Sequence, residues 1–471
     1  TRTRIQRISC ARSTTAQHQR TPHGTTGNRK IQTQNSTQKA GTILNIAFYR
    51  DVDHHNNQAP TGTPLCTITM APATQAVRRR HKRAAAAARA RAATRAASVA
   101  HVEAKEDGSE VPLVVLLLAG NPATAVALLQ LLNTVDATAL RRLHPVVGTA
   151  VETLPWCDRA TGVADVVRWR AAFPAAIGTR LVRLDPAVTA ATLAGLTYLD
   201  VSECEMNVTD EVIRRLPPTL RTLDVHGCSN VFDAVSFAHI PALETLKCSF
   251  TSIGNNAIAT LPPTLAMLQA ACCRVSTGAD FRHMITLRTL KCGQLPKIDV
   301  CSSNLPSSLE DLTILTVRLN PHVAPFAHLA LRALLLCWCQ VPHTALASLP
   351  STIVQLLLAN CTGLATSSFS KPPPPKLDVF YCQNSDLGDA AVATLPPSLS
   401  RLTVAGRASR LTPAATFPQH MPALQKVNLS DTAIGNATIA SLPPQLTTLI
   451  IDNCTNVTST ARQDRLINLK E

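Results

Sequence analysis

One apolar pattern, L-x-x-L-x-Φ with Φ an apolar residue, recurs from residue 196 nearly to the end of the chain. Its copies start 22 to 25 residues apart, the fourth position is Leu in ten of twelve copies, and the sixth is always apolar. Successive side chains of a β-strand point to opposite faces, so each copy predicts a short strand with one apolar face. The first positions are Leu196, Leu220, Leu243, Leu265, Leu287, Leu309, Leu331, Ile353, Leu377, Leu399, Leu424 and Leu446.

A single copy cannot bury its apolar face, and stacking of the copies solves this problem. Stacked strands form a parallel sheet with a continuous core in which each repeat touches only its neighbours. The spacing falls within the 20–29 residues of leucine-rich repeats, which the chain resembles. The resemblance implies an α/β fold, a leucine-rich-repeat solenoid with a curved parallel β-sheet of about twelve repeats over residues 196–471.

Phenylalanine follows a period of two repeats. Five Phe residues lie 43 to 48 residues apart, in alternate copies of the pattern. A large apolar side chain at a repeated position predicts core packing beneath the convex side of a solenoid. These residues are Phe237, Phe281, Phe326, Phe369 and Phe417.

Cysteines keep the repeat period as well. Nine of the fifteen occupy sixth or ninth positions, and no C-x-x-C pair occurs. Cysteine at such positions behaves as a small buried hydrophobe. We therefore expect free thiols, no metal site and no cofactor, in an intracellular protein that is cytoplasmic or, alternatively, nuclear. The nine are Cys248, Cys292 and Cys382 at sixth positions, and Cys204, Cys228, Cys273, Cys339, Cys361 and Cys454 at ninth positions.

The ninth-position Cys, followed by a segment such as NVTDEVIRRLPPTL at residues 207–220, resembles the cysteine-containing subtype of leucine-rich repeats. That subtype is common in F-box proteins, which directs attention to the residues ahead of the repeats. The apolar spacing within residues 112–156 predicts three short helices. We place them at about 122–133, 136–143 and 146–154, with Asp136 or Thr134 as the cap of the second.

This segment is similar to a divergent F-box, the module that docks on the small adaptor of cullin-type ubiquitin ligases. The resemblance lies in an apolar opening, a Leu-rich helix and a closing Trp156, although the L-P-x-E opening of the family is absent. It implies adaptor-binding roles for Leu131 and Leu140. A plain helical cap that shields the first repeat is the alternative. Residues 111–195 are thus predicted to be a cap or F-box-like module followed by a bridge.

Charge separates the repeats from the amino-terminal residues. The formal net charge is +15, but residues 1–110 carry 18 Lys and Arg against 6 Asp and Glu, while the remainder carries 27 against 24. We expect residues 1–110 to be a disordered basic tail and linker, because they lack apolar periodicity. A nucleic-acid partner is expected only through this tail.

Met70 is the first methionine of the chain, and we expect translation to start there. The stretch 70–102 contains no acidic residue and admits three interpretations: a nuclear-import patch at residues 78–83, an organelle transit peptide, or a basic arm without a targeting signal. The apolar run at residues 113–119 is too short to span a membrane, so we expect no membrane partner.

The repeat register predicts which residues face outward on the concave sheet. The fifth-position column is polar in the early copies and becomes apolar at Leu335, Leu357 and Tyr381, and Trp338 lies near it at an eighth position. Exposed aromatic residues in a contiguous patch are typical anchors of protein interfaces. We predict a protein target on this concave patch; a loop or the tail folded over it is the alternative.

No motif for nucleotide binding, metalloprotease or serine-hydrolase chemistry occurs in the sequence, so we expect no enzyme. Two functions remain. One is the substrate-recognition subunit of a cullin-type ubiquitin ligase, with the helices holding the adaptor. The other is a leucine-rich-repeat scaffold or inhibitor with no ligase link. Co-purification with a cullin adaptor distinguishes the two.

Overall fold

A computed structural model of the chain describes residues 121–142, 145–185, 188–204, 207–276, 278–293, 304–316, 319, 326–370 and 372–461. All of them belong to one compact unit, Ala73–Glu471. The predictions for residues 1–110, which include Met70 and the basic stretch after it, lie outside the described residues.

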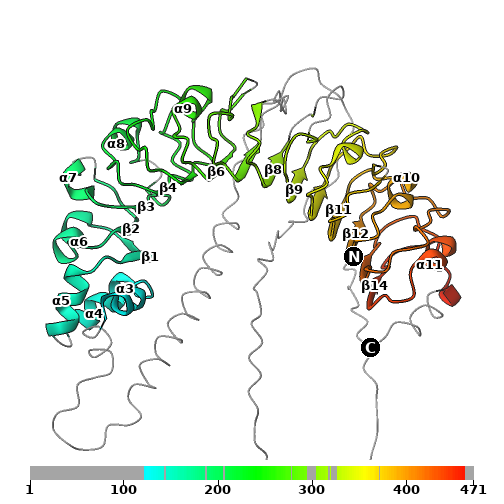
Figure 1. Cartoon of the computed structure of the whole chain (residues 1–471), viewed down its shortest axis with the longest axis horizontal. Helices are drawn as coiled ribbons and strands as arrows, with labels where there is room; N and C mark the ends of the chain where they lie inside the picture. The colour runs from blue at the N-terminus through cyan, green and yellow to red at the C-terminus, as the bar shows by residue number, and fades with distance from the viewer. Residues whose placement is uncertain are drawn as a thin grey trace, which may run out of the picture. The chain divides into compact units, whose positions relative to one another are not determined.

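In the described part of the chain, fourteen parallel strands form one sheet whose strand order follows the sequence. The strands line the inner side of a curve and the helices its outer side (Figure 1). This is a leucine-rich-repeat solenoid, as the spacing predicts. The strands are β1 Cys157–Val163, β2 Gly178–Leu181, β3 Tyr198–Asp200, β4 Thr222–Asp224, β5 Thr245–Lys247, β6 Met267–Ala271, β7 Thr289–Gly293, β8 Asp311–Leu315, β9 Ala333–Cys337, β10 Gln355–Ala359, β11 Val379–Gln383, β12 Arg401–Ala405, β13 Lys426–Asn428 and β14 Thr448–Ile450.

The predicted register of the twelve repeats is confirmed. Fourth-position residues pair with one another from strand to strand, for example Leu312 with Leu334 and Leu334 with Leu356. All first, fourth and sixth positions are buried. Because alternate side chains share a face, burial of these positions leaves the third and fifth to the concave surface.

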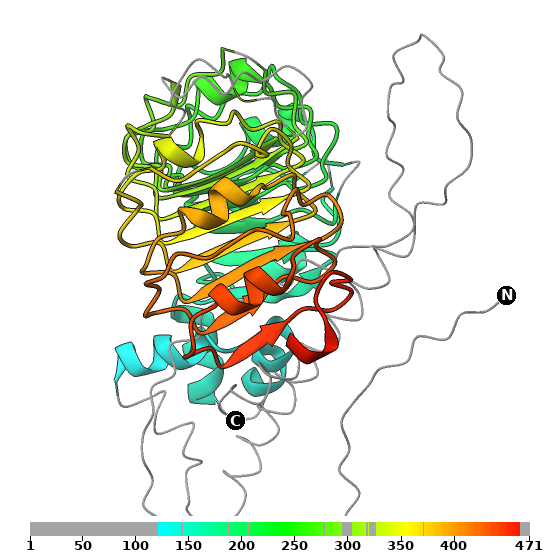
Figure 2. The same ribbon diagram turned by 90° about the vertical axis from the view of Figure 1, so that its right-hand side faces the viewer.

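Short helices and turns cover the outer side of the sheet (Figure 2). The five Phe residues with the two-repeat period are buried beneath this layer, as predicted. Phe369 also makes an edge-to-face contact with Phe380 of β11, with ring centroids 5.5 Å apart. The outer helices are α7 Ala190–Leu193, α8 Asp210–Arg214, α9 Asn255–Ala259, η2 Leu346–Ser348, α10 Asp389–Ala393 and α11 Asn436–Ser441.

Ninth-position cysteines donate weak hydrogen bonds between repeats. The Sγ atoms of Cys273 and Cys454 lie 3.0 Å from the carbonyl oxygens of Cys248 and Leu429, the sixth-position residues of the preceding repeats. A small side chain with a weak donor satisfies a buried carbonyl without adding volume. This contact gives the physical reason for cysteine at the ninth position. The twelve described cysteines are free thiols.

Four helices precede or flank the first strands: α3 Pro122–Leu129, α4 Thr134–Arg141, α5 Pro145–Thr153 and α6 Val166–Ala172. The prediction that Asp136 or Thr134 caps the second helix is wrong. Asn133 caps it, with its side-chain oxygen accepting from the backbone N–H groups of Val135 and Asp136. Asn is among the strongest capping residues because its short side chain reaches these unpaired donors.

The sheet extends two strands further toward the amino terminus than the apolar pattern indicates. Strands β1 and β2 lie in the predicted bridge, residues 157–195, and join the sheet by parallel pairing. Their register is irregular between Cys157 and Gly162, and they lack the L-x-x-L-x-Φ sequence. The backbone pairing of β1 with β2 and of β2 with β3 does not require that sequence, so the pattern alone does not reveal these strands.

The helices pack directly on the beginning of the solenoid. Trp156, Trp169 and Phe173 form a buried aromatic cluster, with the centroids of Trp156 and Phe173 5.2 Å apart. The fully buried carboxylate of Asp158 accepts a 2.7 Å hydrogen bond from the backbone N–H of Thr134, the first residue of α4. Trp169 and Phe173 therefore join the helices to the first strands of the sheet. No helix in the described residues is long and apolar enough to cross a membrane.

Candidate protein-binding surface

Three apolar fifth-position residues adjoin one another on the concave face. Leu335 of β9 pairs with Leu357 of β10, and Leu357 pairs with Tyr381 of β11. Each of the three is half-buried, whereas the residues directly before and after it in its strand are buried. The sequence prediction that these three side chains share one outward column is supported by this pairing.

Trp338 follows β9 in the turn where the chain leaves the concave face. Its backbone N–H donates to the carbonyl of Ala359 at 2.8 Å, which extends the strand pairing by one residue. Its φ is 59°, in the left-handed region, and its side chain is 64% exposed. Trp338 therefore lies at the edge of the sheet, one residue beyond the end of β9.

Sequence reasoning missed three further members of this surface. Leu315 of β8 and Cys337 of β9 are paired seventh-position residues, and Val379 of β11 is a third-position residue; all three are half-buried. Burial, with a smaller contribution from Cys339, raises the pKa of the Cys337 thiol to about 11, so it remains neutral at physiological pH. The apolar patch is defined here as Leu315, Leu335, Cys337, Trp338, Leu357, Val379 and Tyr381.

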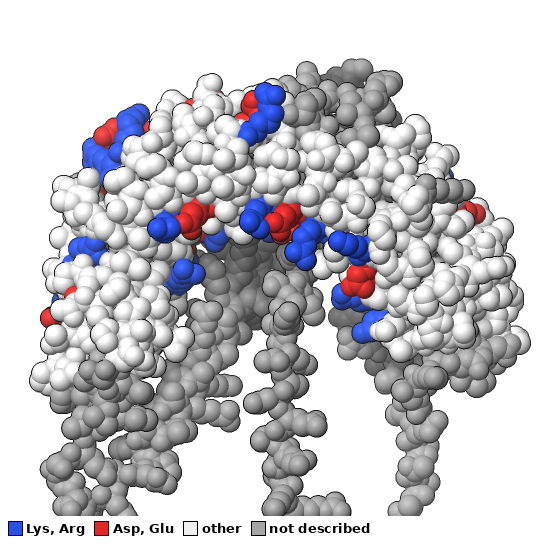
Figure 3. All heavy atoms as spheres, viewed as in Figure 1, with Lys and Arg blue, Asp and Glu red and all other residues white. Residues whose placement is uncertain are grey.

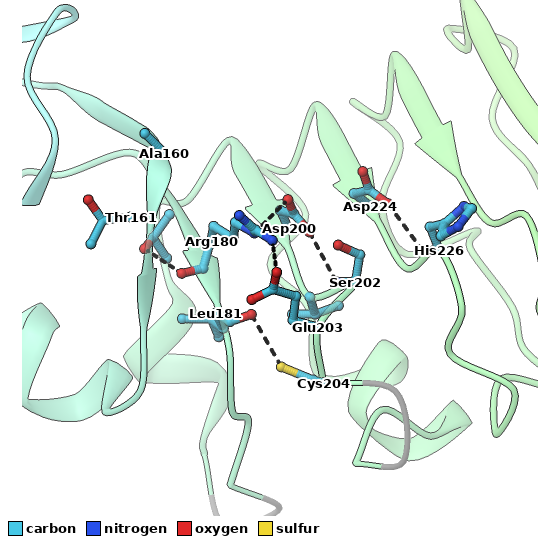
Figure 4. A network of polar contacts seen from close by, with 12 residues as sticks. Ala160, Thr161, Arg180, Leu181, Asp200, Ser202, Glu203, Cys204, Asp224 and His226 are labelled. Atoms are coloured by element: carbon cyan, nitrogen blue, oxygen red, sulfur yellow. Dashed lines mark hydrogen bonds and ion pairs between the residues drawn. The ribbon is translucent and has the colours of Figure 1, made fainter. Parts of the chain in front are cut away.

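The amino-terminal end of the concave face has a different character. Ion pairs engage the fifth-position residues there. The Nε of Arg180 lies 3.5 Å from Asp200 (Figure 4), and the Nζ of Lys247 lies 3.1 Å from Asp224. Arg180 also pairs with Glu203. Asp200 and Asp224 are nearly buried by these partners, although their fifth positions predict outward side chains.

Backbone donors complete the network. The Oδ1 of Asp200 accepts from the N–H of Ser202 at 3.0 Å, and that of Asp224 accepts from the N–H of His226 at 3.1 Å. Each carboxylate therefore has both a cation and a backbone donor, which lowers the cost of its burial. This end of the sheet is therefore polar, with both carboxylates hydrogen-bonded, while the buried Nε of Arg180 has only the 3.5 Å ion-pair contact with Asp200.

Second-position residues add a charged border to the concave face. Ion pairs join neighbouring repeats, including Arg288 with Glu310 at 2.7 Å and Arg221 with Glu244. Charged side chains gather along the inner side of the solenoid, while much of the remaining visible surface is uncharged (Figure 3). The apolar patch is thus an uncharged part of a face whose other regions carry paired charges.

The two residues assigned to adaptor binding occupy different environments. Leu131 lies beyond the end of α3 at Leu129, so the helix is shorter than the predicted 122–133, and the side chain of Leu131 is 80% exposed. Leu140 lies on α4, is half-buried and packs against the core. Leu131 is thus free to contact a partner, whereas the side chain of Leu140 is partly covered by the core.

Among the described residues, no group of three His, Cys, Asp or Glu side chains could hold a metal ion. The fold and the concave patch define the chain as a leucine-rich-repeat solenoid with an open inner face.

Solved structures of similar fold include an internalin of Listeria monocytogenes, with 15% identity, coverage of 71% of this chain and 92% of that chain, and a TM-score of 0.48. Others are a chain of the mouse RP105/MD-1 complex (14% identity, 64% of this chain and 52% of that chain, TM-score 0.40) and a chain of the yeast Rad7–Elc1 complex (17%, 69% and 90%, TM-score 0.34). At these identities the likeness is one of fold alone. No protein-family model matches the chain, and no curated protein is significantly similar to it.

Proposed function

We propose that this chain is a non-catalytic protein-binding solenoid that holds a protein partner on the apolar patch. The observation that carries the proposal is the exposure of Trp338, 64%, beside a continuous column of half-buried apolar residues. Contiguous exposed apolar surface on a folded protein marks interaction sites, and Trp, with Tyr and Arg, is enriched among interface anchors.

The electrostatics of the concave face support the same location. Ion pairs at its amino-terminal end already engage Asp200, Asp224 and Arg180 with partners in the chain. A partner that displaced them would have to replace those contacts, whereas covering the apolar patch removes apolar area from water at about 25 cal/mol per Å². The apolar patch is therefore the part of the face where binding gains most.

A finer proposal assigns the chain to a cullin-type ubiquitin ligase as its substrate-recognition subunit. The observation that favours it is the exposure of two apolar side chains in the amino-terminal helical region, Leu131 at 80% after α3 and Val135 at 64% on α4. Leu140 contributes little there because it packs on the core. A scaffold or inhibitor with no ligase link is the alternative, in which the helices serve only to cap the solenoid.

The test of binding uses the full chain and a partner recovered with it by crosslinking. Trp338→Ala should weaken the affinity for that partner at least tenfold, which corresponds to about 1.4 kcal/mol. Ile285→Ala is the matched control, because Ile285 is an exposed apolar residue outside the patch. Equal affinities for the unmodified chain and the Trp338→Ala variant would show that the apolar patch is not part of the binding surface.

The ligase link has its own test. A purified cullin adaptor is titrated against the full chain and against Leu131→Asp, a change that places a charge on an exposed side chain and leaves the core intact. Adaptor binding that Leu131→Asp abolishes supports the ligase proposal. If the adaptor does not bind the unmodified chain, the helices are a cap and the scaffold proposal stands.

A further inference from the structure

Along the first half of the concave face, cations pair with carboxylates of the neighbouring repeat. The Nζ of Lys247 lies 3.1 Å from Asp224, and the guanidinium of Arg288 lies 2.7 Å from Glu310. Opposite charges on neighbouring strands stabilise a sheet, whereas like charges directly opposite each other destabilise it. This part of the concave face therefore has its charges neutralised within the chain.

Arg401 and Lys426 depart from this arrangement. Arg401 of β12 pairs directly with Lys426 of β13, so two cations lie side by side on adjacent strands. Both are exposed third-position residues, and the fourth-position residues that follow them, Leu402 and Val427, are buried. Because alternate side chains share a face, the two cations lie on the concave surface. Strand pairing continues their column to Val379 of the apolar patch.

The chain neutralises this pair of cations only in part. One carboxylate oxygen of Asp378 lies 3.5 Å from the Arg401 guanidinium, and both side chains are exposed. The other oxygen of Asp378 accepts from the hydroxyl of Ser400. An exposed ion pair contributes little, because water and salt screen it. In the part of the chain that the structure describes, no carboxylate lies within ion-pair distance of the Lys426 ammonium.

We propose that Arg401 and Lys426 bind a carboxylate side chain of the protein partner that covers the apolar patch. The proposal rests on the proposed function and adds to it the charge of the partner at one edge of the patch. Adjacent like charges cost stability in the free chain, and features that a fold does not favour by itself occur at functional sites. A guanidinium holds a carboxylate through two parallel N–H donors, and the neighbouring ammonium adds a point charge with further donors.

The charge at this position favours a carboxylate over other anions. Two cations against the single carboxylate of Asp378 leave one positive charge, which one Asp or Glu side chain of the partner neutralises. A phosphate group carries about −1.5 to −2 at pH 7 and would leave an excess of negative charge. The carboxyl ends of the same strands have the opposite sign, because Asp431 follows β13 and Asp452 follows β14. A partner carboxylate is therefore attracted to the Arg401 and Lys426 end of these strands and repelled at the other.

The spacing of the third-position column predicts where the acidic residue lies in the partner. Neighbouring strands are about 4.8 Å apart, so the midpoint between Arg401 and Lys426 lies roughly 7 Å from Val379. An extended segment that crosses the strands covers this distance in about two residues, and side chains two positions apart share one face. We therefore expect an acidic residue about two positions from an apolar one.

The experiment uses a displayed library of random 16-residue peptides selected on the full chain. A selected peptide is synthesised with its acidic residue intact and with Gln or Lys in its place, and each form is titrated against the unmodified chain and Lys426→Glu. Lys426→Glu should weaken binding of the acidic form at least about tenfold and strengthen binding of the Lys form, because like charges in contact repel and opposite charges attract. Affinity for the Gln form should change little.

Arg410→Glu is the matched control. It makes the same change of charge at an exposed residue, which lies outside the sheet in an isolated bridge with Gly388. Affinity for the acidic form should be nearly unchanged in this variant. The Tm of Lys426→Glu should not fall, because Lys426 is exposed and a Glu at this position pairs with Arg401. Loss of binding in Lys426→Glu is then distinguished from loss of the fold.

The outcomes separate this inference from the proposed function. Peptides that lack an acidic residue, or that lose affinity in Trp338→Ala but not in Lys426→Glu, refute the carboxylate contact and leave the apolar patch as the binding surface. Equal losses in Lys426→Glu and Arg410→Glu, or equal losses for the acidic and Gln forms, also refute the contact. Unchanged affinity in both Lys426→Glu and Trp338→Ala, or no selected peptide at all, refutes both proposals.

Two further results would replace the proposed occupant. Tighter binding of a peptide with phosphoserine at the acidic position than of the acidic form overturns the carboxylate in favour of a phosphate. A homodimer of the full chain that Lys426→Glu dissociates overturns the partner protein in favour of a second copy.

Discussion

Replacement of Leu334 by Ala tests the register on which the binding surface depends. Leu334 lies in the middle of β9, is 1% exposed, and pairs with Leu312 on one side and Leu356 on the other. Truncation of a fully buried Leu leaves a cavity and costs about 2–5 kcal/mol. The stacked repeats on both sides are rigid parts of the same core, so we expect a cost in this range.

Its neighbour Leu335 supplies the matched control, because it has the same side chain in the same strand on the opposite face. Leu335 is half-buried, so Leu335→Ala should cost about 1 kcal/mol, half of the 1.5–3 kcal/mol for full burial. Urea unfolding followed by circular dichroism measures both, and an unchanged slope m makes the midpoint shift a shift in stability. A larger loss for Leu335→Ala than for Leu334→Ala would mean a register shifted by one residue, which would move every assigned surface side chain into the core.

Two further predictions concern the helical cap and the thiols. Asp158→Ala removes the carboxylate that accepts from the backbone N–H groups of Thr134, Ala160 and Thr161, at a cost of about 1–3 kcal/mol for the groups left unpaired. Hydrogen exchange should therefore accelerate in α4 while β9 keeps its protection; equal acceleration in both would show that the cap and the repeats unfold as one unit. Burial raises the pKa values of Cys292 and Cys382 to about 12 from a usual value of 9.0. Burial of these two thiols in the neutral form stabilises the fold fully below pH 9. This stabilisation is lost as the pH rises toward 12, because between pH 9 and pH 12 the thiols ionise in the unfolded chain but not in the folded one. The Tm should fall between pH 9 and pH 11 and fall less in the Cys292→Ala, Cys382→Ala double variant; identical slopes would contradict the assignment.

The amino-terminal helices were predicted from the sequence in number and approximate position, but not in their exact ends. Apolar spacing predicted three helices, and the structure has α3, α4 and α5 close to the expected positions. Their caps were harder to predict, because Asn133, Thr134 and Asp136 are all good capping residues within one turn and only the backbone geometry selects among them. The role of the helices as an F-box or a cap stays a prediction, since both require the same apolar spacing.

The sequence by itself determined the solenoid. The repeat fixed the period, the inward positions and the register, because a two-residue alternation allows only one set of side chains to be buried. It also placed Leu335, Leu357 and Tyr381 in one column, since equivalent positions of successive repeats must pair.

Only the tertiary structure decided what lies at the ends and edges of the sheet. Strands β1 and β2 join by backbone pairing with their neighbours, which leaves no apolar signature in the sequence. The left-handed conformation of Phe250 and Trp338 results from the turn that every repeat makes after its strand, and two isolated aromatic residues do not reveal it. The fifth-position Asp residues are covered by Arg180 and Lys247 from neighbouring strands. Each of these features depends on which residues are brought together when the repeats stack. The sequence of a single repeat does not specify which residues of the adjacent repeats it will contact.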